Sequence, residues 1–307
     1  MKTKKILIVG GNGNIGKYLA HYLNSKYHLY ILDKKFKKTP NSKIKNFIKH
    51  NLLSRKKIKT KKNFDVVIFL VGLTGGPKSI FIKNLKLYIK YNCETLLNFL
   101  DQKNRVKFKK IIFASTEQVY GDDPKFINQI KLIEPSPKNY YGLSKLLSEK
   151  ILYNYYSKKF ISVDVLRFPR VIFKNNNNLI SKMILSAKNS NKIQLHDTTT
   201  KFNFLYIEDF VKAILSCMGK TNTGYSVYNI FNESSPLNLV EIAKFIKRKL
   251  HKVRIIKRQK KPFKQHNPVN LKFNTSLTKR KIKWKPSHSN LDIIKMLIKF
   301  HEIKEHY

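Results

Sequence analysis

The sequence predicts an α/β protein in which helices cover both faces of a parallel sheet. Short apolar runs alternate with longer amphipathic segments through the first half of the 307 residues, and this alternation is typical of strands joined by crossover helices. A glycine-rich turn follows the first apolar run, and an aspartate ends the second. Together these features predict a doubly wound sheet with a ligand site at the carboxyl ends of its strands.

Five apolar runs, rich in Val, Ile, Leu and Phe, predict buried strands. They cover residues 5–11, 28–33, 65–72, 110–116 and 163–168. Between them, Ile15, Leu19 and Leu23 recur at helical spacing, and a longer helix is expected around Tyr88, Leu96, Leu97 and Leu100. We assign all of these apolar positions to the core, because a helix packs its apolar stripe against the sheet.

The regular alternation ends near residue 170. Irregular stretches are expected at 175–178, at 219–225 and over the basic segment 251–264. Two later helices are expected from Leu239, where Asn238 and Glu241 fit a capping box, and from Leu291. We therefore expect a cofactor-binding domain over 1–170 and a smaller substrate-binding domain over 171–307, with residues around 202–216 returning to the first.

The composition fits a globular chain with an unusual charge. The chain is 42% hydrophobic, with 63 Lys and Arg against 18 Asp and Glu, giving a net charge of +45. The lysines are spread over nearly every segment, so we attribute them to compositional drift rather than to a nucleic-acid surface. Such a field still attracts anionic substrates.

Cellular location and metal binding follow from what the sequence lacks. No apolar run reaches the roughly 20 residues needed to cross a bilayer, and the N-terminal segment does not fit a signal peptide. We expect a cytoplasmic protein without a membrane partner. Two distant cysteines, Cys93 and Cys217, form neither a disulfide framework nor a metal site.

The turn GGNGNIG, residues 10–16, joins the first strand to the first helix. Gly10, Gly13 and Gly16 form a spacing variant of the dinucleotide-binding fingerprint, in which a pyrophosphate approaches the backbone at a helix N-terminus. Asp33 ends the next strand about 20 residues later, where a carboxylate accepts the ribose hydroxyls of NAD and repels the 2′-phosphate of NADP. The neighbouring Lys34 and Lys35 weaken this preference for NAD.

The stretch NYYGLSK, residues 139–145, holds two adjacent tyrosines ahead of a lysine. On a helix Tyr141 shares a face with Lys145, whereas Tyr140 faces Ser144. An unperturbed phenol has a pKa of about 10, and a nearby ammonium favours the phenolate. We expect Lys145, together with an oxidised nicotinamide, to bring Tyr141 within range of proton transfer.

Eight ordered blocks, spread over nearly the whole chain, resemble the extended short-chain dehydrogenase/reductases, the NAD-dependent nucleotide-sugar epimerases and dehydratases. The blocks are ILIVGGNGNIG, the strand ending in Asp33, FASTEQVYG, YYGLSKLLSE, LRFPRVIF, FLYIEDFVKAIL, YNIFNESSPLNLVEIAKFI and KWKP. The resemblance implies a Rossmann domain that holds NAD tightly, followed by a smaller sugar-nucleotide domain. It also implies a homodimer formed through the helices that contain Asn92 and Tyr141.

The resemblance assigns roles residue by residue. It implies Thr116, Tyr141 and Lys145 as the catalytic group, with Thr116 also binding substrate together with Glu117 and Arg170. The implied cofactor contacts are Gly10, Gly13, Asn14, Ile15, Gly16, Asp33, Leu70, Val71, Gly72, Asn92, Tyr141, Lys145 and Phe168, and no metal ligand is implied.

Several positions depart from the family pattern. Asn51 stands where relatives often have an aspartate at the adenine, Arg170 replaces an asparagine that usually meets the substrate diphosphate, and Phe202 and Asn203 replace an Arg-Asp pair. Gln118 stands where the dehydratases have a glutamate as base, and an amide cannot accept a proton. Dehydration is therefore disfavoured.

Three functions remain open. The first is an NAD-dependent epimerase of a nucleotide sugar, similar to UDP-glucose 4-epimerase, which oxidises the sugar transiently and returns the hydride. The second is a reductase or 4,6-dehydratase of a nucleotide-linked keto sugar. The third, from another class, is a protein on the same scaffold that binds NAD or RNA without catalysis.

Overall fold

The computed structural model describes residues 3–35, 46–54, 56–74, 84–102, 104–121, 136–159, 161–174, 178–196, 198, 200–220, 224–257, 273 and 275–303. The chain forms two compact units. The first comprises Met1–Val119, Pro135–Arg167 and Ile214–Tyr228, and the second comprises Tyr120–Glu134, Phe168–Ala213 and Asn229–Tyr307. The predicted roles of residues 1–170 and 171–307 as cofactor and substrate domains stay predictions.

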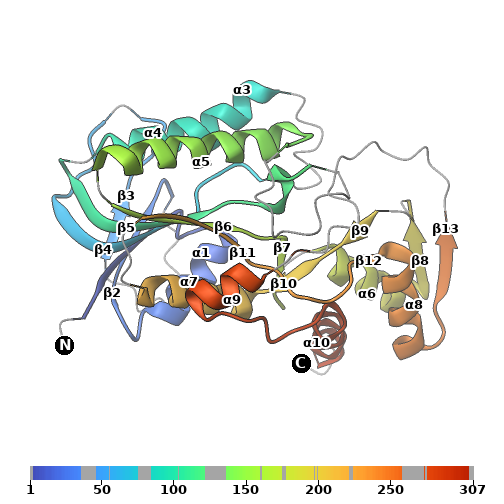
Figure 1. Cartoon of the computed structure of the whole chain (residues 1–307). Coiled ribbons are helices and arrows are strands. Elements are labelled where there is room, and N and C mark those ends of the chain that lie inside the picture. Colours follow the sequence, from blue (N-terminus) through green and yellow to red (C-terminus); the bar gives the residue numbers. More distant parts are fainter. Residues whose placement is uncertain are drawn as a thin grey trace. The chain divides into compact units, whose positions relative to one another are not determined.

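A seven-stranded sheet forms the centre of the first unit (Figure 1). Its strands are β1 (Lys5–Val9), β2 (His28–Asp33), β3 (Asn46–Lys49), β4 (Lys62–Phe69), β5 (Val106–Ala114), β6 (Ser162–Arg167) and β11 (Tyr225–Asn229). They lie in the order β11-β6-β5-β4-β1-β2-β3, and every neighbouring pair from β6 to β3 is parallel. The predicted doubly wound parallel sheet is confirmed.

The order of the strands reverses between β1 and β4. From β1 the chain adds β2 and β3 on one side, and it then returns to add β4, β5 and β6 on the other. Val9, which ends β1, pairs with Leu32 of β2 and with Phe69 of β4. The loops that follow β1 and β4 therefore leave the sheet at the same level, at the switch point where ligands of this fold class bind.

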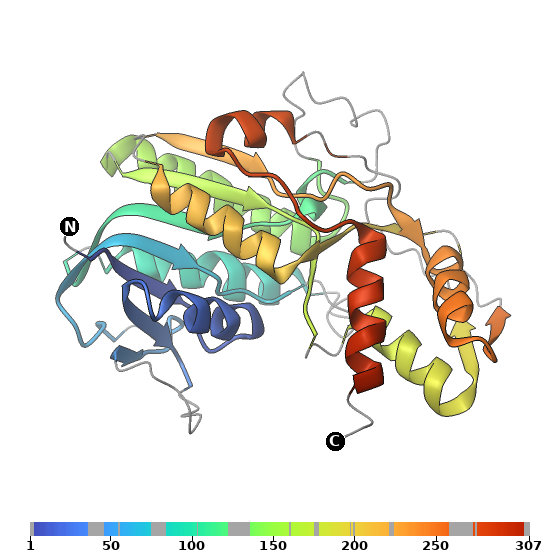
Figure 2. The ribbon, with the colours of Figure 1, turned by 90° about the horizontal axis from the view of Figure 1, so that it is seen from below.

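Helices cover both faces of this sheet, because its central strands are apolar on both sides. In the first unit they are α1 (Asn14–Leu23), α3 (Leu85–Tyr88), the π-helical segment η1 (Ile89–Glu94), α4 (Thr95–Leu100), the 3₁₀ segment η2 (Glu117–Val119), α5 (Tyr140–Lys159) and the C-terminal part of α7 (Ile207–Gly219). The run from α3 to α4 lies beside α5 on one face (Figure 1). α1 and α7 lie on the other face, turned toward the viewer in Figure 2.

The structure corrects several predicted elements of the first unit. The helix expected around residue 88 is interrupted by one π-helical turn, and Leu97, assigned to the core, is 44% exposed. In the stretch 219–225, expected to be irregular, Gly219 ends α7, Tyr225 begins β11, and residues 221–223 lie outside the described residues. β11 joins the sheet beside β6. The signal for β11 is weak because only five residues form it, and two of its three apolar side chains are half-buried.

The described part of the second unit contains short strands and helices of its own, besides the N-terminal part of α7. They are β7 (Arg170–Ile172), β8 (Lys192–Leu195), β9 (Lys201–Phe202), β10 (Phe204–Tyr206), β12 (Leu237–Asn238), β13 (Arg254–Lys257), α6 (Leu179–Ser190), α8 (Leu239–Leu250), α9 (Ser276–Ile282) and α10 (Asn290–Ile303). β7 pairs with β10, β9 with β12 and β8 with β13.

The predicted late helices are confirmed, and so is the capping box of Asn238 and Glu241. The basic segment 251–264 was expected to be irregular, but its part Arg254–Lys257 is a strand, and 258–264 lies outside the described residues. In the stretch 175–178, Asn178 caps α6, and the other three residues are also outside the described part.

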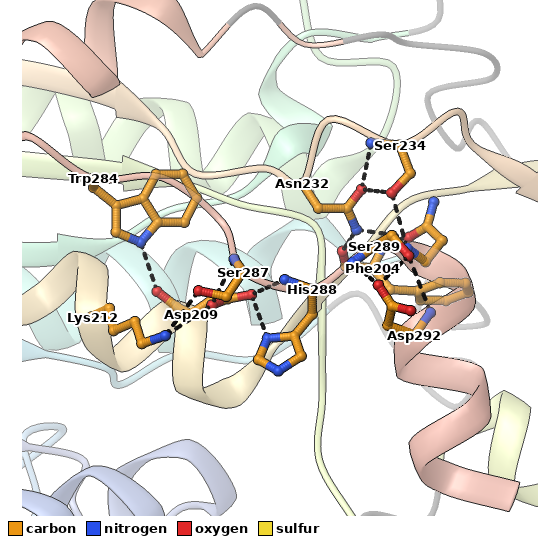
Figure 3. A network of polar contacts seen from close by, with 11 residues as sticks. Phe204, Asp209, Lys212, Asn232, Ser234, Trp284, Ser287, His288, Ser289 and Asp292 are labelled. Atoms are coloured by element: carbon orange, nitrogen blue, oxygen red, sulfur yellow. Dashed lines mark hydrogen bonds and ion pairs between the residues drawn. The ribbon is translucent and has the colours of Figure 1, made fainter.

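A buried aspartate fixes the segment before α10 (Figure 3). Asp209, in α7, is fully buried and accepts the backbone N–H groups of Ser287 and His288 at 3.1 Å each. His288 Nδ1 lies 2.9 Å from the same carboxylate, and Trp284 Nε1 donates to the Asp209 carbonyl at 2.9 Å. The Asp209 carboxylate thus accepts hydrogen bonds from backbone N–H groups that are not paired within a helix or a sheet.

Helix α5 approaches η2 closely through a glycine. A side-chain carbon at Gly142 would lie 2.3 Å from the Gln118 carbonyl oxygen. The Asn139 side chain accepts the N–H of Gly142 at 2.7 Å and so starts the helix. The first turn of α5 therefore lies directly against the segment that follows β5.

A buried lysine joins the sheet to the end of α7 in the first unit. Lys110 Nζ forms an ion pair with Asp164 of β6 at 3.0 Å and donates to the Cys217 and Lys220 carbonyls at 2.8 and 2.9 Å. A cation at a helix C-terminus satisfies carbonyls that have no helical partner. The neighbouring Lys109 makes an exposed pair with Asp65 at 2.9 Å.

Lys110→Met should lower the free energy of unfolding by about 3–5 kcal/mol, because it leaves the Asp164 carboxylate buried without its counter-ion. Urea unfolding measures the loss. Lys109→Met, next to it, is the control and should cost less than about 1 kcal/mol, because its ion pair is exposed. Equal losses in the two variants would contradict the assignment.

Gly142→Ala should destabilise the protein by more than about 1 kcal/mol, although alanine favours a helix more than glycine does. The added methyl meets a backbone carbonyl that cannot rotate away, so α5 must move from η2. Thermal unfolding measures the effect. A stabilised variant would show that α5 and η2 are not in close contact.

Candidate active site

The glycine turn lies at the switch point of the sheet. Its backbone packs so closely against neighbouring residues that side chains would not fit. Gly10 has a φ of +85°, and a side-chain carbon there would touch Val71, which follows β4. A side-chain carbon at Gly16 would lie 2.5 Å from the Gly10 carbonyl oxygen. Gly13 is the N-cap of α1, whose first turn contains the exposed Asn14 and the half-buried Ile15. The free N–H groups of this turn suit the pyrophosphate of a dinucleotide.

Asp33 is held against this turn. Its carboxylate accepts the backbone N–H of Asn12 at 3.0 Å and that of Lys35 at 3.2 Å, and the Asn12 side chain donates to the Lys35 carbonyl at 2.9 Å. A carboxylate has about four acceptor positions, so Asp33 retains acceptors for two ribose hydroxyls. Lys34 Nζ lies 5.9 Å from the centre of the Tyr91 ring.

Asn51, the departure expected at the adenine, has a structural contact of its own. Its side-chain oxygen accepts the N–H of Leu53 at 3.1 Å and closes a turn after β3. An aspartate would form the same turn, so the substitution preserves the backbone while removing one negative charge.

Asn92 fixes the loop after β4 rather than pointing freely into the site. It lies in η1 and is 1% exposed. Its side-chain oxygen accepts the Leu73 N–H at 2.6 Å, and its amide donates to the Leu73 carbonyl at 3.2 Å and to Ser144 Oγ at 2.7 Å. A side-chain carbon at Gly72 would lie 2.9 Å from that Asn92 oxygen and 4.0 Å from Lys145 Nζ. Of the predicted contacts, Gly72 thus lies beside Asn92 and Lys145, whereas Leu70 and Val71 lie beside Gly10. Residues 75–77 of the same loop lie outside the described residues.

Tyr141 and Thr116 come together from α5 and from the end of β5. The side chains are hydrogen-bonded, and this bond partly offsets burial, which raises the pKa of Tyr141 to about 12. The negative charge of Glu117 and the nearby Tyr88 raise the pKa further. Tyr140 is 44% exposed. Of the two tyrosines, Tyr141 is therefore the one inside the site.

The expected lowering of the Tyr141 pKa does not occur in the protein alone. Lys145 is 4% exposed, and its Nζ lies 4.0 Å from the centre of the Phe113 ring. Burial lowers the pKa of Lys145 to about 8, against the opposing effects of Glu149 and Cys93. Desolvation therefore dominates both groups, and it disfavours their charged forms. A positive charge beside the phenol would oppose the effect of burial.

Two predicted residues lie in the second unit. The half-buried Phe168 packs its ring 4.6 Å from that of Phe210. Arg170, in β7, places its guanidinium 4.6 Å from the centre of the Phe202 ring, at one of the positions that departs from the family pattern. Their predicted roles toward cofactor and substrate stay predictions.

Sequence reasoning missed a buried group behind the candidate catalytic residues. Ser115, Glu149 and Arg167 are each less than 9% exposed, and both Ser115 and Arg167 are hydrogen-bonded to Glu149. The spacing of Lys145 and Glu149, four residues apart on one helix, was an available signal. It was overlooked because a glutamate in a lysine-rich helix normally faces solvent. Among the described residues, no group of three or more His, Cys, Asp or Glu side chains is placed to bind a metal ion, and no described helix is long and apolar enough to span a membrane.

Comparison with solved structures confirms the fold. MoeE5 in complex with UDP-glucuronic acid and NAD superposes with a TM-score of 0.82 at 18% identity, covering 98% of this chain and 99% of the other. The UDP-glucuronic acid 4-epimerase of Bacillus cereus gives a TM-score of 0.79 at 21% identity over 99% and 100%. These likenesses, below 25% identity, show the Rossmann-type architecture.

Similarity in sequence indicates the family to which the chain belongs. A dTDP-D-glucose 4,6-dehydratase from Dictyostelium discoideum is 32% identical over 285 residues, which cover 79% of this chain but 61% of that protein. A Bacillus subtilis protein described as an uncharacterized UDP-glucose epimerase is 27% identical over 74% of this chain and 76% of its own length. The NAD dependent epimerase/dehydratase family matches residues 6–230. The chain therefore belongs to the NAD-dependent epimerase/dehydratase family of short-chain dehydrogenase/reductase enzymes.

Proposed function

We propose that the chain is an NAD-dependent epimerase of a nucleotide sugar. The observation that carries the proposal is the hydrogen bond between Tyr141 and Thr116, formed on a helix turn that lies against the strand end. Two hydroxyl groups from separate elements converge on one point, and a buried ammonium lies on the same helix face. A base, an orienting hydroxyl and a cation are the groups that alcohol oxidation requires.

The residues at the glycine turn suit the family's cofactor. Close backbone packing at Gly10 and Gly16 leaves no room for side chains, and Asp33 retains acceptors for a ribose. NAD supplies hydride acceptance and return when bound. Gly10, Gly13 and Gly16 would hold its pyrophosphate, Asp33 its adenosine ribose and Lys145 its nicotinamide ribose.

Proton transfer falls to Tyr141. Its phenolate takes the proton of a sugar hydroxyl that Thr116 orients, and it returns the proton when the sugar is reduced on its other face. Lys145 stabilises the phenolate by its charge. The first turn of α5 adds the positive end of the helix dipole. Burial raises the Tyr141 pKa to about 12, and a positive charge beside the phenol would lower it.

A second candidate is a 4,6-dehydratase or a keto-sugar reductase. The 32% identity to the Dictyostelium dehydratase favours the dehydratase. Gln118 opposes it, because an amide cannot remove the proton that elimination requires. Solvent deuterium incorporated at C5 or C6 of the sugar would identify this branch.

Tyr141→Phe should lower turnover at least about 100-fold, because general acid–base catalysis typically contributes that much or more. The neighbouring Tyr140→Phe is the matched control and should stay within about twofold, because that side chain is 44% exposed. The assay follows UDP-glucose, UDP-N-acetylglucosamine and UDP-glucuronic acid by NMR, after the nucleotide released on denaturation is identified.

Absence of turnover together with absence of released nicotinamide would overturn the enzymatic proposal. RNA binding that weakens steeply with salt would instead favour the non-catalytic alternative. The proposal includes a cytoplasmic location and no nucleic-acid partner.

We also propose that the protein is a homodimer formed through α4 and α5. Leu97 of α4 and Leu147 of α5 are 44% and 39% exposed, whereas Leu96 of α4 and Leu152 of α5 are buried in the core. Leu97→Glu with Leu147→Glu should convert a dimer to a monomer in sedimentation experiments, because a buried apolar contact becomes charged. Leu277→Glu, at another exposed leucine, is the control. A monomeric parent protein would exclude the dimer.

A further inference from the structure

A buried carboxylate connects three elements that carry the candidate active site. Glu149 is 2% exposed, and Arg167 of β6 donates to its two oxygens from Nε at 3.1 Å and from Nη2 at 2.5 Å. Ser115 Oγ, at the end of β5, donates to Glu149 Oε1. Tyr225 of β11 donates to the Glu149 carbonyl at 3.2 Å. One residue of α5 thus contacts the last three strands on this side of the sheet.

Two residues of this group lie next to residues of the proposed chemistry. Ser115 directly precedes Thr116. Glu149 follows Lys145 by four residues, so it lies one helical turn away on the same face. The charge of Glu149 favours the ammonium form of Lys145 against the desolvation of the site. Arg167 is the buried counter-ion of the Glu149 carboxylate, and a buried charge requires such a partner.

Few other charged groups face these two residues within the described part of the chain. Cys93 of η1 lies near Lys145, and its pKa is raised by burial, so it stays neutral at pH 7. Tyr225, beside Glu149, has its pKa raised by burial and is also neutral. The Phe113 ring supplies a weak attraction to the ammonium. Glu149 is therefore the anion that balances Lys145.

We propose that Glu149, with Arg167 as its counter-ion, is a positioning residue that holds Lys145 as an ammonium and fixes the strand end that carries Thr116. The inference rests on the proposed function, which gives Lys145 and Thr116 their roles. The carboxylate itself touches neither reacting group in the proposed chemistry.

The test uses Lys145→Met as a probe of the lysine's protonation. Burial lowers the Lys145 pKa from 10.5 to about 8, so the folded state disfavours the ammonium. This penalty is complete below the folded pKa and disappears as the pH rises to the unfolded pKa. Lys145→Met removes it, so the variant should be more stable than the parent at low pH, and the gain should fade between about pH 8 and pH 10.5.

The same substitution is then made in the double variant Glu149→Gln/Arg167→Met. Removing both partners avoids a guanidinium buried without its carboxylate, which would cost folding stability. Without Glu149, the Lys145 pKa falls further. In this background, the stability gained by Lys145→Met should begin to decline about one pH unit lower than in the parent protein. At pH 6.5, the factor by which Lys145→Met raises the folding equilibrium constant should be about ten times larger than in the parent protein. Urea unfolding from pH 6 to 10 measures both changes.

A second buried pair between the same two strands provides the control. Lys110→Met/Asp164→Leu removes an ion pair from β5 and β6 whose side chains are 7% and 3% exposed. It should leave the pH dependence of the Lys145→Met gain unchanged. An equal shift in both backgrounds, or none in the Glu149 background, would overturn the proposal.

Turnover separates this proposal from the proposed function. If a nucleotide sugar is converted, the Glu149→Gln/Arg167→Met variant should show a lower kcat, with KM within about threefold and the alkaline limb of the pH profile about one unit lower. If sugar is converted but the alkaline limb does not move, the proposed role of Glu149 is wrong and the proposed function stands. If the stability measurements shift but no sugar is converted, the enzymatic proposal is wrong and the role of Glu149 stands.

Discussion

The candidate active site depends on the desolvation of one ammonium group. Lys145 lies beneath the loop after β4 and against an aromatic ring, where its charge is costly. Two charged groups lie close by. The Glu149 carboxylate follows Lys145 by one helical turn, and the buried Arg167 guanidinium binds that carboxylate. The proposed chemistry requires the charge, and burial opposes it. In our proposal, the polar cluster around Glu149 offsets part of the cost of burial.

The same conflict explains the properties of Tyr141. A phenol held away from water is a weak acid, and the bond to Thr116 compensates only in part. Burial and the bond to Thr116 therefore shift the pKa of this phenol in opposite directions, and burial has the larger effect.

The architecture could be predicted from the sequence because its signals are local. Apolar runs, a glycine turn and Asp33 define the sheet order near β1, and the spacing of Tyr141 and Lys145 defines a helix face. Glu149, Arg167 and Ser115 could not be placed in the same way, because their contacts join residues from three elements. The direction of the pKa shifts was also beyond the sequence, since it depends on burial rather than on residue type. Leu97 was wrongly assigned to the core because helical spacing marks an apolar stripe without showing how wide the covered part is.

The π-helical turn at Ile89–Glu94 interrupts the regular hydrogen bonding of its helix, and the loop beside the candidate site depends on that interruption. Such a turn contains one residue more than an α-helix would need, and Asn92 lies inside it. A chain shortened by one residue there would restore the ordinary ladder of hydrogen bonds, while the preceding residues would rotate by about 100°. The helix would become more regular, and Leu73 would lose the carboxamide that holds its backbone. A slightly imperfect helix is thus a condition for the loop beside Lys145 to keep its shape.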